Sequence, residues 1–216
     1  MHPIVLVRHG EAANTIEGAP GGWGDSPLTE LGRRQSALVG DRLRRELQMA
    51  RCHLVASDLP RAWETAQIVG EATKFELHQA IGLRAFNNGV ASGMTQEQAA
   101  RHLKPVTQPV TEWQMYPLAE TLRQFYTRTA EYLQDLTEAE DRLLLLVTHR
   151  GVIQNAVVWW LRLGAEVLGT ASFRCAPASI TVLDEGEWGE RRVERLNDTS
   201  HLYAARLPDP LRLQVG

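Results

Sequence analysis

Two arginines and two histidines are the residues of this chain best suited to chemistry. Arg8 and His9 are adjacent near the N-terminus, whereas Arg61 and His149 lie far along the chain. A guanidinium group binds phosphate oxygens through paired hydrogen bonds, and a neutral imidazole can attack phosphorus to form a phosphohistidine. Neighbouring cations lower the pKa of such an imidazole and so keep it neutral. If the four side chains meet, they predict phosphoryl transfer, with His9 as the nucleophile and the other three stabilising the phosphate oxygens.

Metal chemistry is a weaker interpretation of the same histidines. No carboxylates or cysteines with ligand spacing accompany them, whereas zinc sites need three or four protein ligands. The two cysteines, Cys52 and Cys175, are too few and too far apart for a ligand pair or a disulfide framework. We therefore expect no metal, no cofactor and a reducing compartment.

Each of the four side chains follows a segment that is typical of a buried strand. The largely apolar run at residues 4–7 ends before Arg8 and His9. The runs at 52–56 and 142–147 end shortly before Arg61 and His149. Ligands of open α/β sheets bind beyond the carboxyl ends of the strands. The pattern therefore predicts that the four side chains converge at one edge of a sheet.

Helical patterns separate these strands. Predicted helices cover residues 28–47, 60–72, 95–103, 118–136 and 151–163, and further strands are expected at 76–80, 179–183 and 191–196. Thr29 is the expected N-cap of the first helix, and Ser57 or Asp58 caps the second, which has Pro60 in its first turn. Strands thus alternate with helices, which predicts a single α/β domain over residues 1–216.

Composition and charge exclude several classes of protein. The 216 residues are 44% hydrophobic and 23% charged, which is typical of a globular chain large enough to need no disulfide or structural metal. The net charge of −3 does not favour a nucleic-acid or membrane partner. No signal-peptide core or run of 18 apolar residues occurs, so we expect a soluble cytoplasmic protein.

Four segments of the sequence resemble the histidine phosphatase superfamily, also called the phosphoglycerate-mutase-like family. The segments are residues 6–11, 22–32, 56–66 and 147–153, and they occur in the family's order. The resemblance implies a three-layer α/β fold with a mostly parallel central sheet flanked by helices, and no metal. It also implies that His9 is phosphorylated and that Arg8, Arg61 and His149 form the phosphate pocket. Asn14 resembles, one residue early, the asparagine that contacts phosphate after the family's Arg-His-Gly motif.

The sequence departs from the family's pattern at two positions. Relatives commonly carry a glutamate as general acid where this chain has Ala85, which cannot donate a proton. Glu120 is the first candidate substitute, although the favoured interpretation of this residue is a carboxylate at a helix start, where the helix dipole stabilises it. Glu11 is the second and is also a candidate substrate-binding residue. Arg150 replaces a glycine common in relatives and either binds a second acidic group of the substrate or faces solvent.

The resemblance also implies that an irregular insert at about residues 85–117 overhangs the active site. Asn88 in this insert is a candidate substrate-binding residue, with turn formation as the alternative. The insert carries four further side chains of interest, Phe86, Trp113, Met115 and Tyr116. As a lid they would favour a nonpolar or aromatic leaving group; otherwise they pack the insert onto the core.

Three functions fit these observations. The first is a metal-independent phosphomonoesterase that transfers phosphate from a small phosphorylated metabolite to His9 and then to water. The second is a phosphoglycerate-type mutase, which the lack of a long insertion after Arg61 makes less favoured. The third is a catalytically weak phosphate-binding module, because Ala85 removes the usual acid. The expected partner is a small-molecule phosphate ester, without nucleic acid or membrane, and a homodimer is possible.

Overall fold

The computed structural model describes residues 2–14, 18–205 and 207. Its strands form one six-stranded sheet in the order β3-β2-β4-β1-β5-β6. The strands are β1 (Ile4–Arg8), β2 (Cys52–Ala56), β3 (Leu77–Gln79), β4 (Leu143–Thr148), β5 (Ile180–Glu185) and β6 (Arg191–Asp198). Strands β3, β2, β4 and β1 run parallel, whereas β5 and β6 are antiparallel to their neighbours. The predicted α/β fold with a mostly parallel sheet is therefore confirmed.

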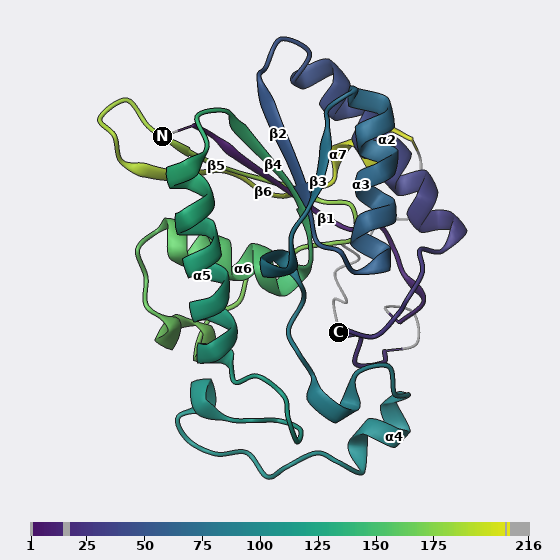
Figure 1. Ribbon diagram of the computed structural model, residues 1–216, viewed down its shortest axis with the longest axis vertical. Coiled ribbons are helices and arrows are strands. Elements are labelled where there is room, and N and C mark those ends of the chain that lie inside the picture. The colour runs from purple at the N-terminus through teal and green to yellow at the C-terminus, as the bar shows by residue number, and fades with distance from the viewer. Residues whose placement is uncertain (1, 15–17, 206, 208–216) are drawn as a thin grey trace.

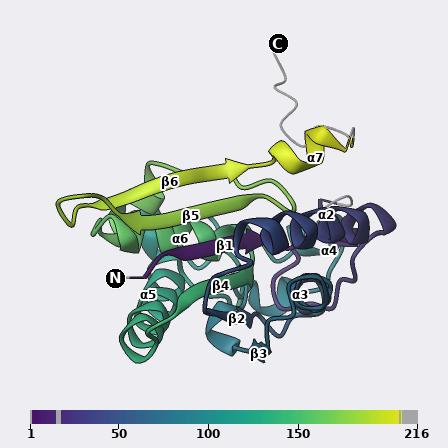
Figure 2. The same cartoon turned by 90° about the horizontal axis from the view of Figure 1, so that it is seen from above.

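Helices cover both faces of this sheet, which gives three layers (Figures 1 and 2). The helices are α2 (Glu30–Glu46), α3 (Pro60–Thr73), α4 (Gln96–Ala100), α5 (Leu122–Ala139), α6 (Arg150–Trp160) and α7 (Ser200–Ala204), with 3₁₀ turns at 81–83, 89–91, 110–112 and 165–169. Alternate residues of β1 explain the layers, since Val5 and Val7 pack with α2 and α3 while Ile4 and Leu6 pack with α5 and α6. Within the described residues, none of these helices combines the length and apolar character needed to cross a bilayer.

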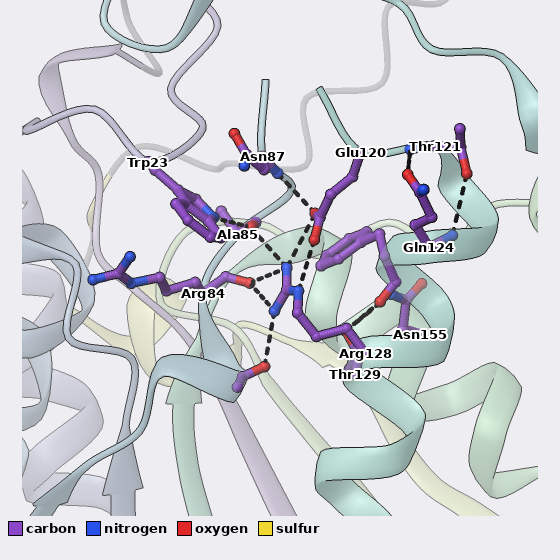
Figure 3. A network of polar contacts seen from close by, with 12 residues as sticks. Trp23, Arg84, Ala85, Asn87, Glu120, Thr121, Gln124, Arg128, Thr129 and Asn155 are labelled. Carbon is purple, nitrogen blue, oxygen red and sulfur yellow. Dashed lines mark hydrogen bonds and ion pairs between the residues drawn. The ribbon is translucent and has the colours of Figure 1, made fainter. Parts of the chain in front are cut away.

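The cap of one predicted helix and the start of another differ from the structure. Thr29 does cap α2, because its side chain accepts a hydrogen bond from the Gly32 amide. The predicted caps of α3 were wrong: its N-cap is Leu59, since the Ser57 hydroxyl instead contacts His149 and the Asp58 carboxylate binds Arg84. Helix α5 begins at Leu122 rather than at 118, after a capping box of Thr121 and Gln124 (Figure 3).

The register of the parallel strands determines where the functional side chains leave the sheet. Val147 of β4 pairs with Val7 of β1 on one side and with Ala56 of β2 on the other. The next residues continue this alignment, because the His9 amide donates to the Thr148 carbonyl at 2.9 Å and the Ser57 amide donates to the Val147 carbonyl at 3.0 Å. The three strands thus end at the same level of one sheet edge.

The insert predicted at about 85–117 lies at this edge of the sheet and contains α4 (Figure 1). It forms a small apolar cluster of its own. Ala91, Ala99, Tyr116 and Ala119 are buried in this cluster, and Phe86, Met94 and Met115 pack against it. Part of the apolar content of the insert therefore packs within the insert itself.

Candidate active site

His9 and His149 lie side by side at the ends of β1 and β4. Their ring centroids are 5.1 Å apart, and the two residues are 4% and 3% exposed. A cavity of about 460 Å³ opens onto them, which we call the phosphate cavity. Its lining includes Arg8, His9, Asn14, Gly18, Ala19, Gly21, Gly22, Arg61, Ala85, Phe86, Asn88, His149, Arg150 and Gly151. The structure thus brings together all four residues singled out for catalysis, and with them Asn14, Asn88 and Arg150.

The hydrogen bond of His9 determines which of its ring nitrogens is free. Nδ1 lies 2.7 Å from the carbonyl oxygen of Gly10. A carbonyl oxygen only accepts hydrogen bonds, so Nδ1 carries the ring hydrogen in the neutral form. The lone pair is then on Nε2, which is the atom available as a nucleophile. The Gly10 amide is held in turn by the Thr65 hydroxyl at 3.1 Å.

His149 is oriented by a residue that sequence reasoning assigned to another role. Its Nε2 lies 2.9 Å from the Ser57 hydroxyl oxygen, and that oxygen also accepts a hydrogen bond from the Leu59 amide at 3.3 Å. Ser57 comes directly after β2, which is the signal that could have identified it. The other ring nitrogen of His149, Nδ1, is buried and has no hydrogen-bond partner among the residues that the structure describes.

Arg61 connects the start of α3 to the long loop after β1. Its guanidinium donates to the carbonyl oxygens of Gly22 at 2.8 Å and of Gly24 at 3.2 Å. Gly22 has a φ of +46°, in the left-handed region that favours glycine, and a Cβ there would lie 2.9 Å from the Asn88 side chain. Glycine at this position therefore lets the loop turn tightly beside the arginine.

Three buried nitrogens of this site have no hydrogen-bond partner within the described protein. Two are the donors Nε of Arg8 and Nε of Arg61, and the third is the ring nitrogen Nδ1 of His149. One Nη of Arg8 is held by the Cys175 carbonyl at 2.6 Å, which fixes the orientation of that guanidinium. Buried polar groups are normally hydrogen-bonded. Their concentration around one cavity fits an anion with several acceptor oxygens, such as phosphate.

The electrostatics of the site keep both imidazoles neutral. Burial lowers the pKa of His9 well below its usual value, and the cations Arg8 and Arg61 lower it further. Burial likewise lowers the pKa of His149, with His9 and Arg61 adding to the effect. Burial also lowers the pKa of Arg8 and of Arg61 to about 10, so both guanidiniums remain charged at neutral pH. The cavity thus combines neutral imidazoles with fixed positive charge.

The buried histidines predict a loss of stability in mild acid. His9 and His149 have lowered pKa values in the folded state, and burial lowers the pKa of His201 to about 4. Between those values and 6.5 the unfolded chain binds more protons, so the free energy of unfolding falls as pH decreases, by up to about 1.4 kcal/mol per pH unit for each histidine. Urea unfolding between pH 6.5 and 5 measures this slope. His201→Gln is expected to make it shallower, and an unchanged slope would contradict the assignment.

Two predicted site residues are not brought to the cavity. The Glu120 carboxylate binds the Arg128 guanidinium, with Oε1 2.7 Å from Nε, and accepts the Asn87 amide at 2.9 Å. The Glu11 carboxylate accepts the Thr29 hydroxyl at 2.8 Å, beside the start of α2. Both carboxylates are thus engaged by other parts of the protein and neither lines the phosphate cavity.

Arg128, which the sequence did not single out, holds the chain segment that carries Ala85 (Figure 3). From α5 its guanidinium donates to the carbonyl oxygens of Gly82 at 3.1 Å and of Ala85 at 3.2 Å. The Ala85 carbonyl also accepts the indole N–H of Trp23 at 2.8 Å. The Trp23 ring lies 4.8 Å from the Arg84 guanidinium carbon, in a cation–π arrangement. This network fixes the position of residue 85 at the edge of the cavity.

The remaining predicted residues have defined surroundings. The Ser26 hydroxyl donates to Oδ1 of Asn14 at 2.8 Å, which orients the amide of that side chain. Arg150 is exposed at the first turn of α6, where it lines the cavity. Across residues 2–14 and 18–205, no group of three or more His, Cys, Asp or Glu side chains is arranged to hold a metal ion.

Comparisons with known proteins agree with this geometry. The family model of the histidine phosphatase superfamily (branch 1) matches residues 4–199. The chain is 32% identical over 158 residues to phosphoglycerate mutase-like protein 4 of Arabidopsis thaliana, covering 70% of this chain and 68% of that protein. It is 30% identical over 224 residues to "Probable phosphoglycerate mutase GpmB" of Enterobacter sp. (strain 638), covering 97% and 99%.

A solved structure has the same fold. Mycobacterial glucosyl-3-phosphoglycerate phosphatase in complex with VO3 matches with a TM-score of 0.77 at 24% identity, covering 92% of this chain and 100% of that one. The family model spans nearly the whole chain, and its match includes Arg8, His9, Arg61 and His149. This chain belongs to branch 1 of the histidine phosphatase superfamily.

Proposed function

We propose that this chain is a metal-independent phosphomonoesterase that passes the phosphoryl group of a small phosphate ester through His9. The observation that carries the proposal is the tautomer of His9, which leaves the lone pair on Nε2, together with buried nitrogens of Arg8, Arg61 and His149 that have no partner in the described part of the chain. These groups suit a tetrahedral dianion. Because both imidazoles are buried and neutral, His9 is ready to attack without prior loss of a proton.

The reaction has two steps. In the first, the lone pair of His9 Nε2 forms a bond to phosphorus while the bond from phosphorus to the leaving oxygen breaks. This gives a phosphohistidine and an alkoxide or phenolate, which keeps the electron pair of the broken bond and then takes a proton from water. Arg8, Arg61 and His149 stabilise the charge that spreads over the other three oxygens. In the second step a water oxygen attacks phosphorus, the N–P bond breaks, inorganic phosphate leaves with the added oxygen, and neutral His9 is restored.

A phosphoglycerate-type mutase is the second candidate. It is favoured by the name of the Enterobacter relative, which aligns with 97% of this chain. The name of the mycobacterial structural neighbour favours a phosphatase instead. The two candidates share the first step and differ in whether water or a bound sugar acid receives the phosphoryl group.

The deciding experiment measures phosphate release from a panel of monoesters with and without EDTA. The proposal predicts EDTA-resistant release, together with a phosphoenzyme that is labile in acid and stable in alkali. Isomerisation of phosphoglycerate that depends on 2,3-bisphosphoglycerate, with little phosphate release, would establish the mutase. Tight binding of vanadate with no turnover on any ester would instead establish a phosphate-binding module.

Glu120→Gln tests whether Glu120 acts as the general acid. The ion pair with Arg128 predicts a structural role, so we expect kcat/KM for alkyl phosphates to change by less than about tenfold. The free energy of unfolding should fall by about 1–3 kcal/mol, because a partly buried charged hydrogen bond is weakened. Steady-state kinetics and urea unfolding measure the two effects. A loss above about 10²-fold that is confined to alkyl phosphates would identify Glu120 as the acid.

A further inference from the structure

A second cavity adjoins the phosphate cavity. Its volume is about 240 Å³, and we call it the apolar cavity because most of its wall consists of Phe86, Met115, Leu122, Phe125 and Leu168. The two cavities are neighbours, since both are lined by Phe86, Asn88 and Gly151. A ligand with a phosphate in the first cavity and an apolar group in the second would span these three residues.

Helix α6 runs from one cavity to the other. Arg150 and Gly151, in its first turn, line the phosphate cavity, while Gln154 and Asn155, one turn later, line the apolar cavity. Residues four apart lie on the same face of a helix. The two cavities are thus consecutive along one helix face, so the apolar cavity is the nearest apolar site for a group attached to a phosphate at the start of α6.

The wall of the apolar cavity is held in place by packing. Phe125 is 3% exposed, and its ring meets that of Phe86 edge to face with centroids 5.5 Å apart. A Cβ at Gly151 would lie 2.7 Å from the Phe125 ring, so only glycine allows that ring to approach the start of α6 this closely. An apolar cavity of about 150 Å³ can bind benzene. The volume here is enough for one aromatic ring with a substituent.

The chemistry around the leaving oxygen limits which groups can depart. Among the described residues that line the two cavities there is no carboxylic acid, thiol, phenol or lysine. Ala85, whose methyl group has no proton to donate, also lines the phosphate cavity. A leaving group that is not protonated must depart as its own anion. Phenols, with a pKa of about 10, are far better leaving groups in this respect than simple alcohols.

We infer, granted the proposed function, that the substrates of this chain are phosphate monoesters of aromatic hydroxyls, with the ring in the apolar cavity and the phosphate against His9. In the reaction the aromatic oxygen keeps the electron pair of the broken P–O bond and leaves as a phenolate, which takes a proton from water. The apolar wall supplies affinity for the ring, and the stability of the phenolate replaces the missing acid.

Three esters test separately whether the leaving group must be acidic and whether it binds through apolar contacts. Phenyl phosphate and cyclohexyl phosphate have leaving groups of similar size and apolarity that differ in acidity, whereas glycerol 2-phosphate has a polar leaving group. We expect kcat/KM for phenyl phosphate to exceed that for cyclohexyl phosphate by at least about 10²-fold. We expect KM for cyclohexyl phosphate to be about tenfold lower than for glycerol 2-phosphate.

Variants of the cavity wall test where the ring binds. Met115→Gln and Leu168→Gln should each raise KM for phenyl phosphate several-fold and leave the inhibition constant of inorganic phosphate unchanged, which also shows that the variant is folded. Leu103→Gln is the control, because Leu103 is half exposed in the same insert and lies outside both cavities.

The outcomes distinguish failure of the inference from failure of the proposed function. Equal kcat/KM for the three esters, or a KM for phenyl phosphate that neither wall variant changes, would overturn the inference while leaving a phosphomonoesterase. No EDTA-resistant hydrolysis of any ester would overturn the proposed function and the inference with it.

Discussion

His9→Ala is expected to lower kcat/KM for phenyl phosphate by about 10⁴-fold or more, which is the scale of losses when a catalytic nucleophile is removed. The side chain that should form the bond to phosphorus is lost, and within the described lining of the cavity the other imidazole, His149, is engaged by Ser57 through Nε2. The acid-labile phosphoenzyme should disappear as well. Rapid quenching with radiolabelled substrate and steady-state kinetics measure the two effects.

The phosphate cavity should survive this substitution. Arg8, Arg61 and His149 remain, so His9→Ala is expected to bind inorganic phosphate or vanadate with an affinity within about tenfold of the wild type. His201→Gln is the matched control, because His201 is also a buried histidine but hydrogen-bonds the Ala178 carbonyl at 3.0 Å rather than lining the cavity. Activity of His9→Ala within tenfold of the control would rule out His9 as the nucleophile.

Ala85→Glu is expected to have the opposite kind of effect, a gain of activity on poor leaving groups. The segment that carries residue 85 is fixed by Arg128 and Trp23, and the alanine lines the phosphate cavity. A carboxylic acid there can protonate the departing oxygen. We expect kcat/KM for cyclohexyl phosphate to rise by about 10²-fold, the lower end of the range for general acid catalysis, because the nearby Arg128 favours the ionised form.

Two further measurements, the hydrolysis of phenyl phosphate and the activity of Ala85→Gln, show whether the gain comes from acid catalysis. Hydrolysis of phenyl phosphate should change by less than about tenfold, because a phenolate leaves without protonation. Ala85→Gln matches the glutamate in size but cannot donate a proton as an acid, so it should not raise activity on cyclohexyl phosphate. An equal gain from Glu and Gln would mean that the substitution acts through packing or binding.

The location of Arg8, His9, Arg61 and His149 could be predicted from the sequence. Strand residues such as Ile4 and Val5 alternate between the two faces, and parallel strands flanked by helices present their carboxyl ends at one edge of the sheet. Both rules depend only on local pattern and the order of elements. They therefore predict that His9 and His149 converge, and the ring centroids do lie 5.1 Å apart.

The partners of individual polar side chains could not be predicted in this way. Glu120 and Arg128 lie on one chain segment, yet the carbonyl oxygens of 82–85 that complete their network come from another part of the chain. Ser57 was expected to cap α3, but its hydroxyl contacts His149 of a different strand end. The hydrogen-bond partner of a polar side chain is decided by competition between several groups at similar distances. The periodicity of the sequence does not indicate which of these groups binds.

The sequence by itself therefore determined the sheet, its flanking helices and the edge of the sheet at which His9 and His149 lie, because repeating backbone geometry specifies these features. Tertiary structure alone decided that Glu120 and Glu11 are engaged away from the cavity and that an apolar cavity continues from the phosphate cavity along α6. Irregular segments such as 82–88 have no repeating geometry, so their side chains acquire positions only when the surrounding elements pack against them.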